Sequence, residues 1–310
     1  MKYYIGIDGG GSHSRLVAID GNKQVIGRYT GGSTNINSET YQGVYENLKR
    51  LLGALEKDFP LSHCAALCIG SAGANIGDNA VLLEQIFREL GIVGQVKVIN
   101  DGELVLIASA NQGGEAKTPC MVIISGTGSI GYGMDCNGII HRAGGWGHIV
   151  DDGGSGYRIG LDALKAVLMG MDGRCAQTSL TDMVLDFFQA NGLGDILTYV
   201  YSDRFKKSEV AKLSLLVSAA VAQGDHIAKE IEIQAAQDLF LIVQALMGKV
   251  SSAMDLERTC TIVFGGSVLL HNTHIRTMVE NLIQTNYPKA CIVPIAKDAE
   301  LFAAEIAHGL

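Results

Sequence analysis

The stretch that decides the fold is YYIGIDGGGSHSRLVAIDGNKQVIGRYTGG, at residues 3–32. Three apolar runs alternate here with two polar turns; the runs lie at residues 2–7, 15–19 and 24–29. Short apolar runs bounded by Gly, Asp and Asn are typical of strands joined by tight turns. The segment therefore predicts a three-stranded β-meander whose first turn is rich in glycine.

The same pattern recurs at residues 121–145. A strand-like run leads into the sequence SGTGS at residues 125–129, a second run follows, and a turn at 135–138 precedes a third run that ends on Gly144 and Gly145. Self-similarity over such a long period indicates one structural unit used twice. We therefore expect two like domains that face each other across a cleft, each with a glycine-rich turn.

The rest of the chain alternates apolar runs with helical periodicity, which is typical of an α/β fold with crossover helices. Ser38 is a candidate N-cap for the first helix, and the polar stretch 111–119 is a candidate linker. The expected helices lie at residues 38–56, 79–90, 103–111, 161–169, 180–189, 208–223, 225–252 and 299–308, and further strands lie at 65–69, 96–99 and 260–264. The predicted domains are residues 1–115 and 116–297.

Charge and composition exclude several classes of function. The net charge is -8, and no basic block is longer than Lys206-Lys207, so neither nucleic acid nor a membrane surface is an expected partner. The chain starts without a secretory signal pattern, and no apolar run approaches the roughly 20 residues that span a bilayer. The 7 scattered cysteines are typical of reduced thiols. We therefore expect a cytoplasmic protein.

The first glycine-rich turn is a candidate phosphate site. Its backbone N–H groups can approach an anion closely because glycine has no side chain, and its hydroxyl adds a donor. The residues concerned are Gly10, Gly11, Ser12 and His13. An ordinary hairpin loop is the alternative, and a histidine in such a loop is more often structural than catalytic.

The second glycine-rich turn changes that balance, because it has the same composition at the same place in the repeat. Its candidate phosphate-binding residues are Gly126, Thr127 and Gly128. Two such turns arise less readily by accident than one, so the pair favours binding of a nucleotide phosphate chain. Asp8, at the end of the first strand, would then hold Mg²⁺ through water, since Mg²⁺ keeps most of its hydration.

Asp101 is the candidate catalytic base. It follows a strand and precedes a helix, which is where open α/β sheets place ligands and catalytic groups. Its alternative role is that of a helix N-cap. Phosphoryl transfer depends mostly on positioning and electrostatics, so such a base needs no raised pKa.

Two loops at the ends of the meanders carry the polar groups that a sugar needs for orientation. They are residues 31–35, with Thr34 and Asn35, and residues 144–157, with Gly145, Trp146 and Asp152. Helix capping by Asp152 or Ser155 is the alternative explanation for the second loop. Gly265, Gly266 and Ser267 follow a buried strand and could let an adenine approach the backbone, although this is also a common strand-to-helix turn.

Taken together, these motifs resemble those of the N-acetylglucosamine kinases in the BadF/BadG/BcrA/BcrD group, and most closely the bacterial N-acetylmuramate/N-acetylglucosamine kinases of cell-wall recycling. The motifs occur in the same order over nearly the whole chain, at residues 7–12, 100–101, 125–129, 144–148 and 264–267. Each piece alone is common, but the combined set is specific to that group.

The resemblance implies two RNase H-like domains of the actin/hexokinase class, a homodimer, and transfer of phosphate from ATP to the 6-hydroxyl of an N-acetylated amino sugar. It matches Asp101 to the general base and Ser12 and Thr127 to phosphate contacts. Asn35, Gly145, Trp146 and Asp152 match positions of the sugar loops, and Gly265 and Gly266 match the adenosine motif. The closing helix, residues 298–310, is expected to return to the first domain.

One departure from the family concerns the second sugar loop. Related kinases tend to have Gly-Asp-Glu-Gly-Ser where residues 151–155 read Asp-Asp-Gly-Gly-Ser. The acidic residue after Asp152 is thus missing, and an extra one precedes it. The Asp151-Asp152 pair leaves glucosamine open as an alternative substrate, because an ammonium group needs an acidic contact.

Two further functions stay open at the level of sequence. One is an ATP-driven activator of 2-hydroxyacyl-CoA dehydratases, which would need cysteines that bind an iron–sulfur cluster. The other is a non-catalytic protein, either an ATP-gated assembly of the actin or chaperone kind or a sugar-responsive repressor. No helix-turn-helix precedes the first strand, which argues against the repressor.

Overall fold

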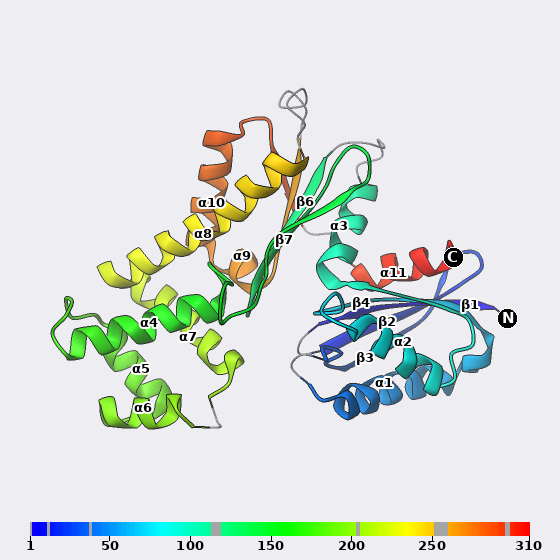
Figure 1. Ribbon diagram of the computed structural model, residues 1–310, viewed down its shortest axis with the longest axis horizontal. Helices are drawn as coiled ribbons and strands as arrows, with labels where there is room; N and C mark the ends of the chain where they lie inside the picture. Colours follow the sequence, from blue (N-terminus) through cyan, green and yellow to red (C-terminus); the bar gives the residue numbers. More distant parts are fainter. Residues whose placement is uncertain are drawn as a thin grey trace. The chain divides into compact units, whose positions relative to one another are not determined.

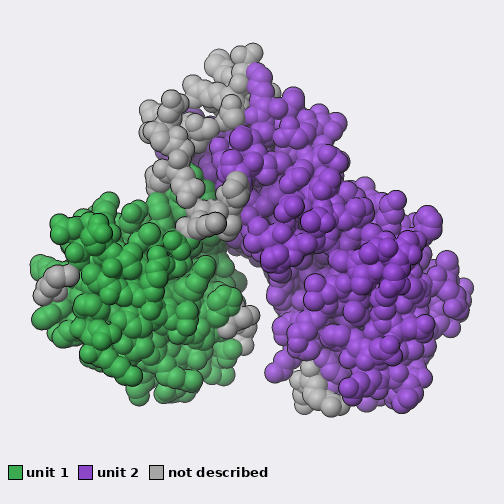
Figure 2. Space-filling view, turned by 180° about the vertical axis from the view of Figure 1, so that it is seen from behind, with its two compact units in different colours: residues 1–114, 296–310 green, residues 115–295 purple. Residues whose placement is uncertain are grey.

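The computed structural model describes residues 2–10, 13–36, 39–112, 119–202, 205–250, 260–294 and 298–310 (Figure 1). The chain divides into two compact units, residues 1–114 with 296–310 as unit 1 and residues 115–295 as unit 2 (Figure 2). Each unit contains one five-stranded sheet and a hydrophobic core of its own.

The sheet of unit 1 has the strand order β3-β2-β1-β4-β5. The first three strands form the meander that the sequence predicts, and β4 and β5 run parallel to β1. The strands are β1 (Tyr3–Gly9), β2 (His13–Asp20), β3 (Val25–Gly32), β4 (Cys64–Ser71) and β5 (Gln95–Asn100). The carboxyl ends of β1, β4 and β5 therefore meet at one edge of the sheet.

Helices cover both faces of this sheet (Figure 1). They are α1 (Tyr41–Glu56), α2 (Asn79–Glu89), α3 (Asp101–Gln112) and α11 (Ala299–His308), with a 3-10 turn at Leu61–His63. The alternation along β2 sends Leu16 into the core with α1 and α2 and Val17 into the core with α11. Gly6 lets α11 approach, because a Cβ there would collide with the backbone of Glu300.

The sheet of unit 2 has the order β10-β9-β6-β7-β8, which repeats the topology of unit 1. Again the first three strands form an antiparallel meander and the other two run parallel to its first strand. The strands are β6 (Cys120–Ser125), β7 (Ser129–Met134), β8 (Ile140–Gly144), β9 (Thr261–Gly265) and β10 (Cys291–Pro294). The duplicated unit inferred from the sequence is therefore confirmed.

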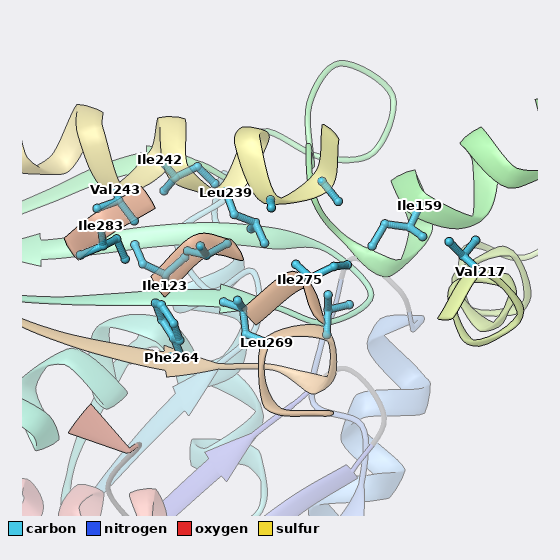
Figure 3. Packing of buried hydrophobic residues seen from close by; sticks show 14 of the residues in the cluster. Ile123, Ile159, Val217, Leu239, Ile242, Val243, Phe264, Leu269, Ile275 and Ile283 are labelled. Atoms are coloured by element: carbon cyan, nitrogen blue, oxygen red, sulfur yellow. The ribbon is translucent and has the colours of Figure 1, made fainter. Parts of the chain in front are cut away.

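Most of the helices in the described ranges belong to unit 2. They are α4 (Gly156–Met171), α5 (Leu180–Phe188), α6 (Leu193–Val200), α7 (Lys207–Ala222), α8 (His226–Val250), α9 (Ser267–His271) and α10 (Thr273–Asn286). Apolar side chains of α8, including Leu239 and Val243, pack with Ile123 of the sheet (Figure 3). The same cluster extends to Ile159 on α4 and Val217 on α7, so one core joins the sheet to the helical part.

Several expected helix boundaries were wrong. Thr40 caps α1 by accepting a hydrogen bond from the Gly43 N–H at 3.1 Å, so the proposed cap at Ser38, which lies outside the described residues, is incorrect. Helix α4 starts five residues before the expected position because Ser155 caps it and accepts from Arg158 N–H at 3.2 Å. Asp101 is the first residue of α3 rather than a residue before it.

Helices α6 and α10 and the edge strand β10 were not predicted, and α9 was anticipated only as the helix of a possible strand-to-helix turn at residues 265–267. Strand β10 has only 4 residues, too few for a visible alternation. Within the described ranges, no helix is both long and apolar enough to cross a bilayer.

Candidate active site

Two carboxylates lie at the carboxyl edge of the unit 1 sheet. Asp8 is near the end of β1, and Asp101 directly follows β5. Burial raises the pKa of Asp101 to about 6, and the negative charge of Asp8 adds to this rise. Strand pairing explains why they meet: Asp8 lies opposite Gly70 of β4, whose next residue Ser71 lies opposite Asn100 of β5, so residues 93 positions apart in sequence reach one edge of the sheet.

The backbone at the start of α3 orients the Asp101 carboxylate. The Gly102 N–H donates to Asp101 Oδ1 at 2.9 Å and to Asn100 Oδ1 at 3.0 Å. Asn100 is buried and takes the capping role that had been the alternative for Asp101. One carboxylate oxygen of Asp101 is thus fixed. The hydrogen bond lowers the pKa of Asp101, but the effect of burial is larger and the net change is upward.

A chain of charges that the sequence analysis missed supports Asp8. Arg15 Nη2 donates to Asp8 Oδ2 at 2.6 Å, and Arg15 Nε lies 3.6 Å from Oε2 of the buried Glu300. Arg28 Nη1 binds the other oxygen of Glu300 at 3.0 Å. Helix α11 therefore contributes to the electrostatics around Asp8, although almost the whole chain separates the two in sequence.

The carboxylate of Asp8 fits a magnesium ion held mainly by water and phosphate. Its side chain is 20% exposed, and its oxygens are of the hard type that Mg²⁺ prefers. Among the described residues, no group of three or more His, Cys, Asp or Glu side chains could hold a metal ion. A site of one or two carboxylates completed by substrate phosphates is the common arrangement for this ion.

The first glycine-rich turn lies against the loop that contains Thr34 and Asn35. Gly10 N–H donates to His13 O at 3.0 Å, and Thr34 N–H reaches Gly10 O at 3.4 Å. The Thr34 side chain is fully buried, with its Oγ1 3.0 Å from Ser71 Oγ. Thr34 thus ties the turn to the end of β4. Two further candidates in this turn, Gly11 and Ser12, lie outside the described residues.

The second glycine-rich turn is anchored on the first turn of α4. Gly156 N–H donates to Gly126 O at 2.8 Å, and Tyr157 N–H donates to Thr127 O at 3.3 Å. Within the part of the chain that the structure describes, the N–H groups of Thr127 and Gly128 have no acceptor. A turn whose carbonyl groups are already hydrogen-bonded and whose N–H groups are free can bind an anion.

The candidate adenosine motif packs directly on this turn, because β9 lies beside β6 in the sheet. Gly266 has a φ of 82°, and a Cβ there would collide with the carbonyl of Ser125. A Cβ on Gly126 would lie 3.7 Å from Ser267 N. The structure therefore places the two predicted nucleotide motifs of unit 2, residues 126–128 and 265–267, in contact.

The loop after β8 is stiffened by one arginine. Arg142 donates to Gly144 O at 3.0 Å and to Gly145 O at 2.5 Å, and its guanidinium lies 4.3 Å from the centroid of the Trp146 ring. Trp146 N–H donates to Asp151 Oδ2 at 3.1 Å, while the indole is 69% exposed. An exposed indole on a fixed backbone is available for a ligand.

Asp152 is buried against the second glycine-rich turn. It has a φ of 66°, and its side chain is only 4% exposed. Its Oδ2 accepts from Lys207 Nζ at 2.7 Å and lies 3.0 Å from the position of a Cβ on Gly128. The sequence analysis did not find Lys207, because this contact joins residues 55 positions apart and Lys207 stood out only as half of a two-lysine block.

Gly153 is packed closely against helix α8 and the second glycine-rich turn. A Cβ on Gly153 would lie 3.0 Å from Cβ and Oδ2 of Asp238 on α8. The carbonyl of Gly153 accepts from Ser129 Oγ at 2.7 Å, which holds the loop close to the turn. A side chain at residue 153 would therefore meet the carboxylate of Asp238.

Comparison with known proteins gives a consistent result. The profile of the BadF/BadG/BcrA/BcrD ATPase family matches residues 5–304. The N-acetylmuramic acid/N-acetylglucosamine kinase of Clostridium acetobutylicum is 37% identical and covers 99% of both chains. The N-acetyl-D-glucosamine kinase of Dictyostelium discoideum is 30% identical and covers 99% of this chain and 98% of its own.

Solved structures agree on the fold. A protein from Chromobacterium violaceum assigned as an N-acetylglucosamine kinase superposes with a TM-score of 0.78 at 23% identity, covering 99% of each chain. A ROK family glucokinase from Streptomyces griseus, solved with glucose and AMPPNP, gives 0.60 at 15% identity and covers 99% of this chain and 100% of its own. The predicted α/β fold of the actin/hexokinase class is confirmed.

Proposed function

The chain belongs to the BadF/BadG/BcrA/BcrD ATPase family, and from that premise we propose that it is an ATP-dependent kinase of N-acetylated amino sugars. The proposed reaction moves the γ-phosphoryl group of ATP to the 6-hydroxyl of N-acetylglucosamine, N-acetylmuramate or both. Support comes from the two relatives above, which are named for this activity and align over almost their full length.

The observation that carries the proposal is the position of Asp101. Its carboxylate lies at the carboxyl ends of the parallel strands β1, β4 and β5, fixed by Gly102 N–H and coupled to Asp8. In this proposal Asp101 accepts the proton of the sugar hydroxyl as the bond to phosphorus forms. Its pKa of about 6 leaves it ionised at neutral pH, yet close enough to neutrality to take up a proton.

The two glycine-rich turns are the proposed phosphate contacts. N–H groups would neutralise the developing charge on the phosphoryl oxygens, which is the main requirement of this chemistry. The assigned residues are Gly10, Gly11, Ser12 and His13 in unit 1 and Gly126, Thr127, Gly128, Gly265, Gly266 and Ser267 in unit 2. Bound Mg²⁺, held by Asp8 through water, would supply further charge neutralisation at the phosphates.

The proposed sugar contacts are Asn35, Gly145, Trp146 and Asp152, with Thr34 fixing the loop that carries Asn35. The exposed indole of Trp146 offers a flat apolar face, and the backbone around it is held by Arg142. Sugar rings stack on such faces while amides and carboxylates bind the hydroxyl groups. This division explains why the loop combines glycine, tryptophan and acidic residues.

The cellular setting follows from the same resemblance. We assign the enzyme to a homodimer that recycles cell-wall amino sugars in the cytoplasm, where ATP is available. The proposed domains are residues 1–115 with 298–310 and residues 116–297. Sedimentation velocity on the purified protein tests the dimer, for which a mass of one chain, 32.9 kDa, would be the contradicting result.

A panel of sugars tests the activity. Purified protein is incubated with ATP, Mg²⁺ and either N-acetylglucosamine, N-acetylmuramate, glucosamine or glucose, and ADP is measured. We expect ADP with at least one N-acetylated sugar, at a rate about tenfold or more above that with glucosamine and glucose. ADP release that does not depend on the sugar, or equal use of glucose, would exclude this function.

A further inference from the structure

Lys207 stands out as a cation at the second glycine-rich turn. It is the first residue of α7, and its Nζ lies 3.3 Å from the position that a Cβ on Gly128 would occupy. Neither the sequence motifs nor the family resemblance assigns it a role. We propose that Lys207 is a nucleotide-binding residue whose ammonium group contacts the polyphosphate of ATP at the turn 126–128; this rests on the proposed function.

The hydrogen-bonding capacity of Lys207 supports this role. An ammonium group has three N–H donors and no acceptor. Within the described residues its single recorded hydrogen bond goes to Asp152 Oδ2 at 2.7 Å. Two donors therefore remain, and the side chain is 33% exposed, so a ligand can reach them. Asp152 holds the ammonium beside the turn and leaves it accessible to solvent.

The second glycine-rich turn offers donors of its own beside the Lys207 ammonium. The free N–H groups of Thr127 and Gly128 and the ammonium of Lys207 lie around Gly128, which has no side chain of its own, and the Asp152 carboxylate at this point is paired with that ammonium. A phosphate oxygen is the ligand that uses both kinds of donor. Adenosine, which lacks phosphate, would gain nothing from this cluster.

The competing explanation is that Lys207 only neutralises the buried carboxylate of Asp152. A purely structural ion pair would make the sugar loop, not the nucleotide, sensitive to loss of the lysine. The two explanations therefore differ in which substrate loses affinity when Lys207 is changed. They can be separated by equilibrium binding, without reference to turnover.

The experiment compares Lys207→Met with Lys207→Gln, which keeps an N–H donor for Asp152 but has no charge. Lys212→Met is the matched control, because Lys212 lies on the same helix, is 55% exposed and pairs with Glu209. Isothermal titration measures the Kd of ATP, ADP and adenosine for each variant. We expect both Lys207 variants to bind ATP and ADP about 10- to 100-fold more weakly, with adenosine unchanged.

ATP and ADP affinities within twofold of the wild type in either variant would overturn the proposal, as would an equal loss for adenosine. A raised sugar KM with unchanged ATP affinity would establish the structural ion pair instead. If the wild type binds no ATP, the proposed function fails and this inference fails with it. If the wild type binds ATP and both variants match it, only the inference about Lys207 fails.

A second measurement needs no variant, so it holds even if the variants do not fold. The wild-type protein is acetylated with a lysine-reactive ester, and modification at each lysine is read by peptide mass spectrometry. We expect ATP to reduce acetylation of Lys207 at least about threefold, while adenosine does not, and Lys212 to be unaffected by either. Equal labelling of Lys207 with and without ATP would contradict the proposal.

Discussion

Replacing Asp101 by asparagine should separate catalysis from stability. Asparagine keeps an oxygen that can accept from Gly102 N–H, so the start of α3 is preserved, but it cannot take the proton of a sugar hydroxyl. Loss of a general base typically costs about 10²- to 10⁴-fold in turnover. We therefore expect kcat to fall by that factor while sugar and ATP affinities stay within about threefold.

The same change should make the protein more stable. The pKa of Asp101 is raised from 3.8 to about 6, and each unit corresponds to about 1.4 kcal/mol, so the ionised carboxylate costs at most about 3 kcal/mol at neutral pH. The cost is absent below the unfolded pKa, where the group is protonated in both states. It grows as the pH rises to about 6 and is constant above that value.

Thermal denaturation at two pH values measures this effect. The Asp101→Asn variant should melt several degrees above the wild type at pH 7.5 and close to it at pH 4. The wild type should also lose kcat/KM about tenfold per pH unit below about pH 6, as the base becomes protonated. Retention of turnover within tenfold of the wild type, or equal losses in turnover and sugar affinity, would refute the assignment of Asp101 as the base.

Three further substitutions or titrations test other parts of the account. Gly266→Ala should weaken ATP binding by about tenfold or more in a titration, because a Cβ there collides with the Ser125 carbonyl at a φ of 82°. Asp225→Asn should lower the free energy of unfolding by about 1–3 kcal/mol in urea, because its carboxylate accepts hydrogen bonds from the chain before α5 and from the first turn of α8. Burial alone would raise the pKa of Asp225, but these hydrogen bonds lower the pKa below its ordinary value. The stabilisation is therefore complete at a pH above the ordinary pKa of an aspartate and is lost as the pH falls through the lowered pKa. Trp146 fluorescence should change when an N-acetylated sugar that the enzyme phosphorylates is added, because Trp146 is 69% exposed and the chain contains no other tryptophan.

Each of these expectations has a clear contrary result. Gly21→Ala is the control for the glycine change, since a Cβ there meets nothing within 4 Å, and equal ATP affinities in the two variants would remove Gly266 from the nucleotide site. An Asp225→Asn variant as stable as the wild type at pH 7 would show that its hydrogen bonds contribute nothing net. Unchanged emission on saturation with a confirmed sugar would exclude Trp146 from the sugar loop.

Much of the fold could be predicted because the deciding signals are local. Strand alternation and turn residues at 3–32 and 121–145 determine the two meanders, and the repeat shows that the fold is duplicated. Asp101 was proposed as the base because it stands between a strand and a helix, the place where open α/β sheets carry catalytic groups, and this role stays a prediction. The family motifs then assigned roles to these positions.

The missed features are those that depend on contacts between distant parts of the chain. Arg15 carries no local signal, since its partners Asp8 and Glu300 are brought to it only by sheet pairing and by the return of α11. Lys207 reaches Asp152 because α7 packs beside α4, a tertiary arrangement that no short motif encodes. Strand β10 forms because β9 offers it an edge.

The position of the transferred phosphate on the sugar distinguishes a 6-kinase from other ATP-using enzymes. N-acetylglucosamine and N-acetylmuramate are each incubated with the protein, ATP and Mg²⁺, and the products are identified by phosphorus and proton NMR. We expect at least one sugar to be converted to its 6-phosphate, with phosphorus coupled to the two protons on carbon 6. Phosphate on the anomeric oxygen, or ATP hydrolysis that leaves both sugars unmodified, would contradict it.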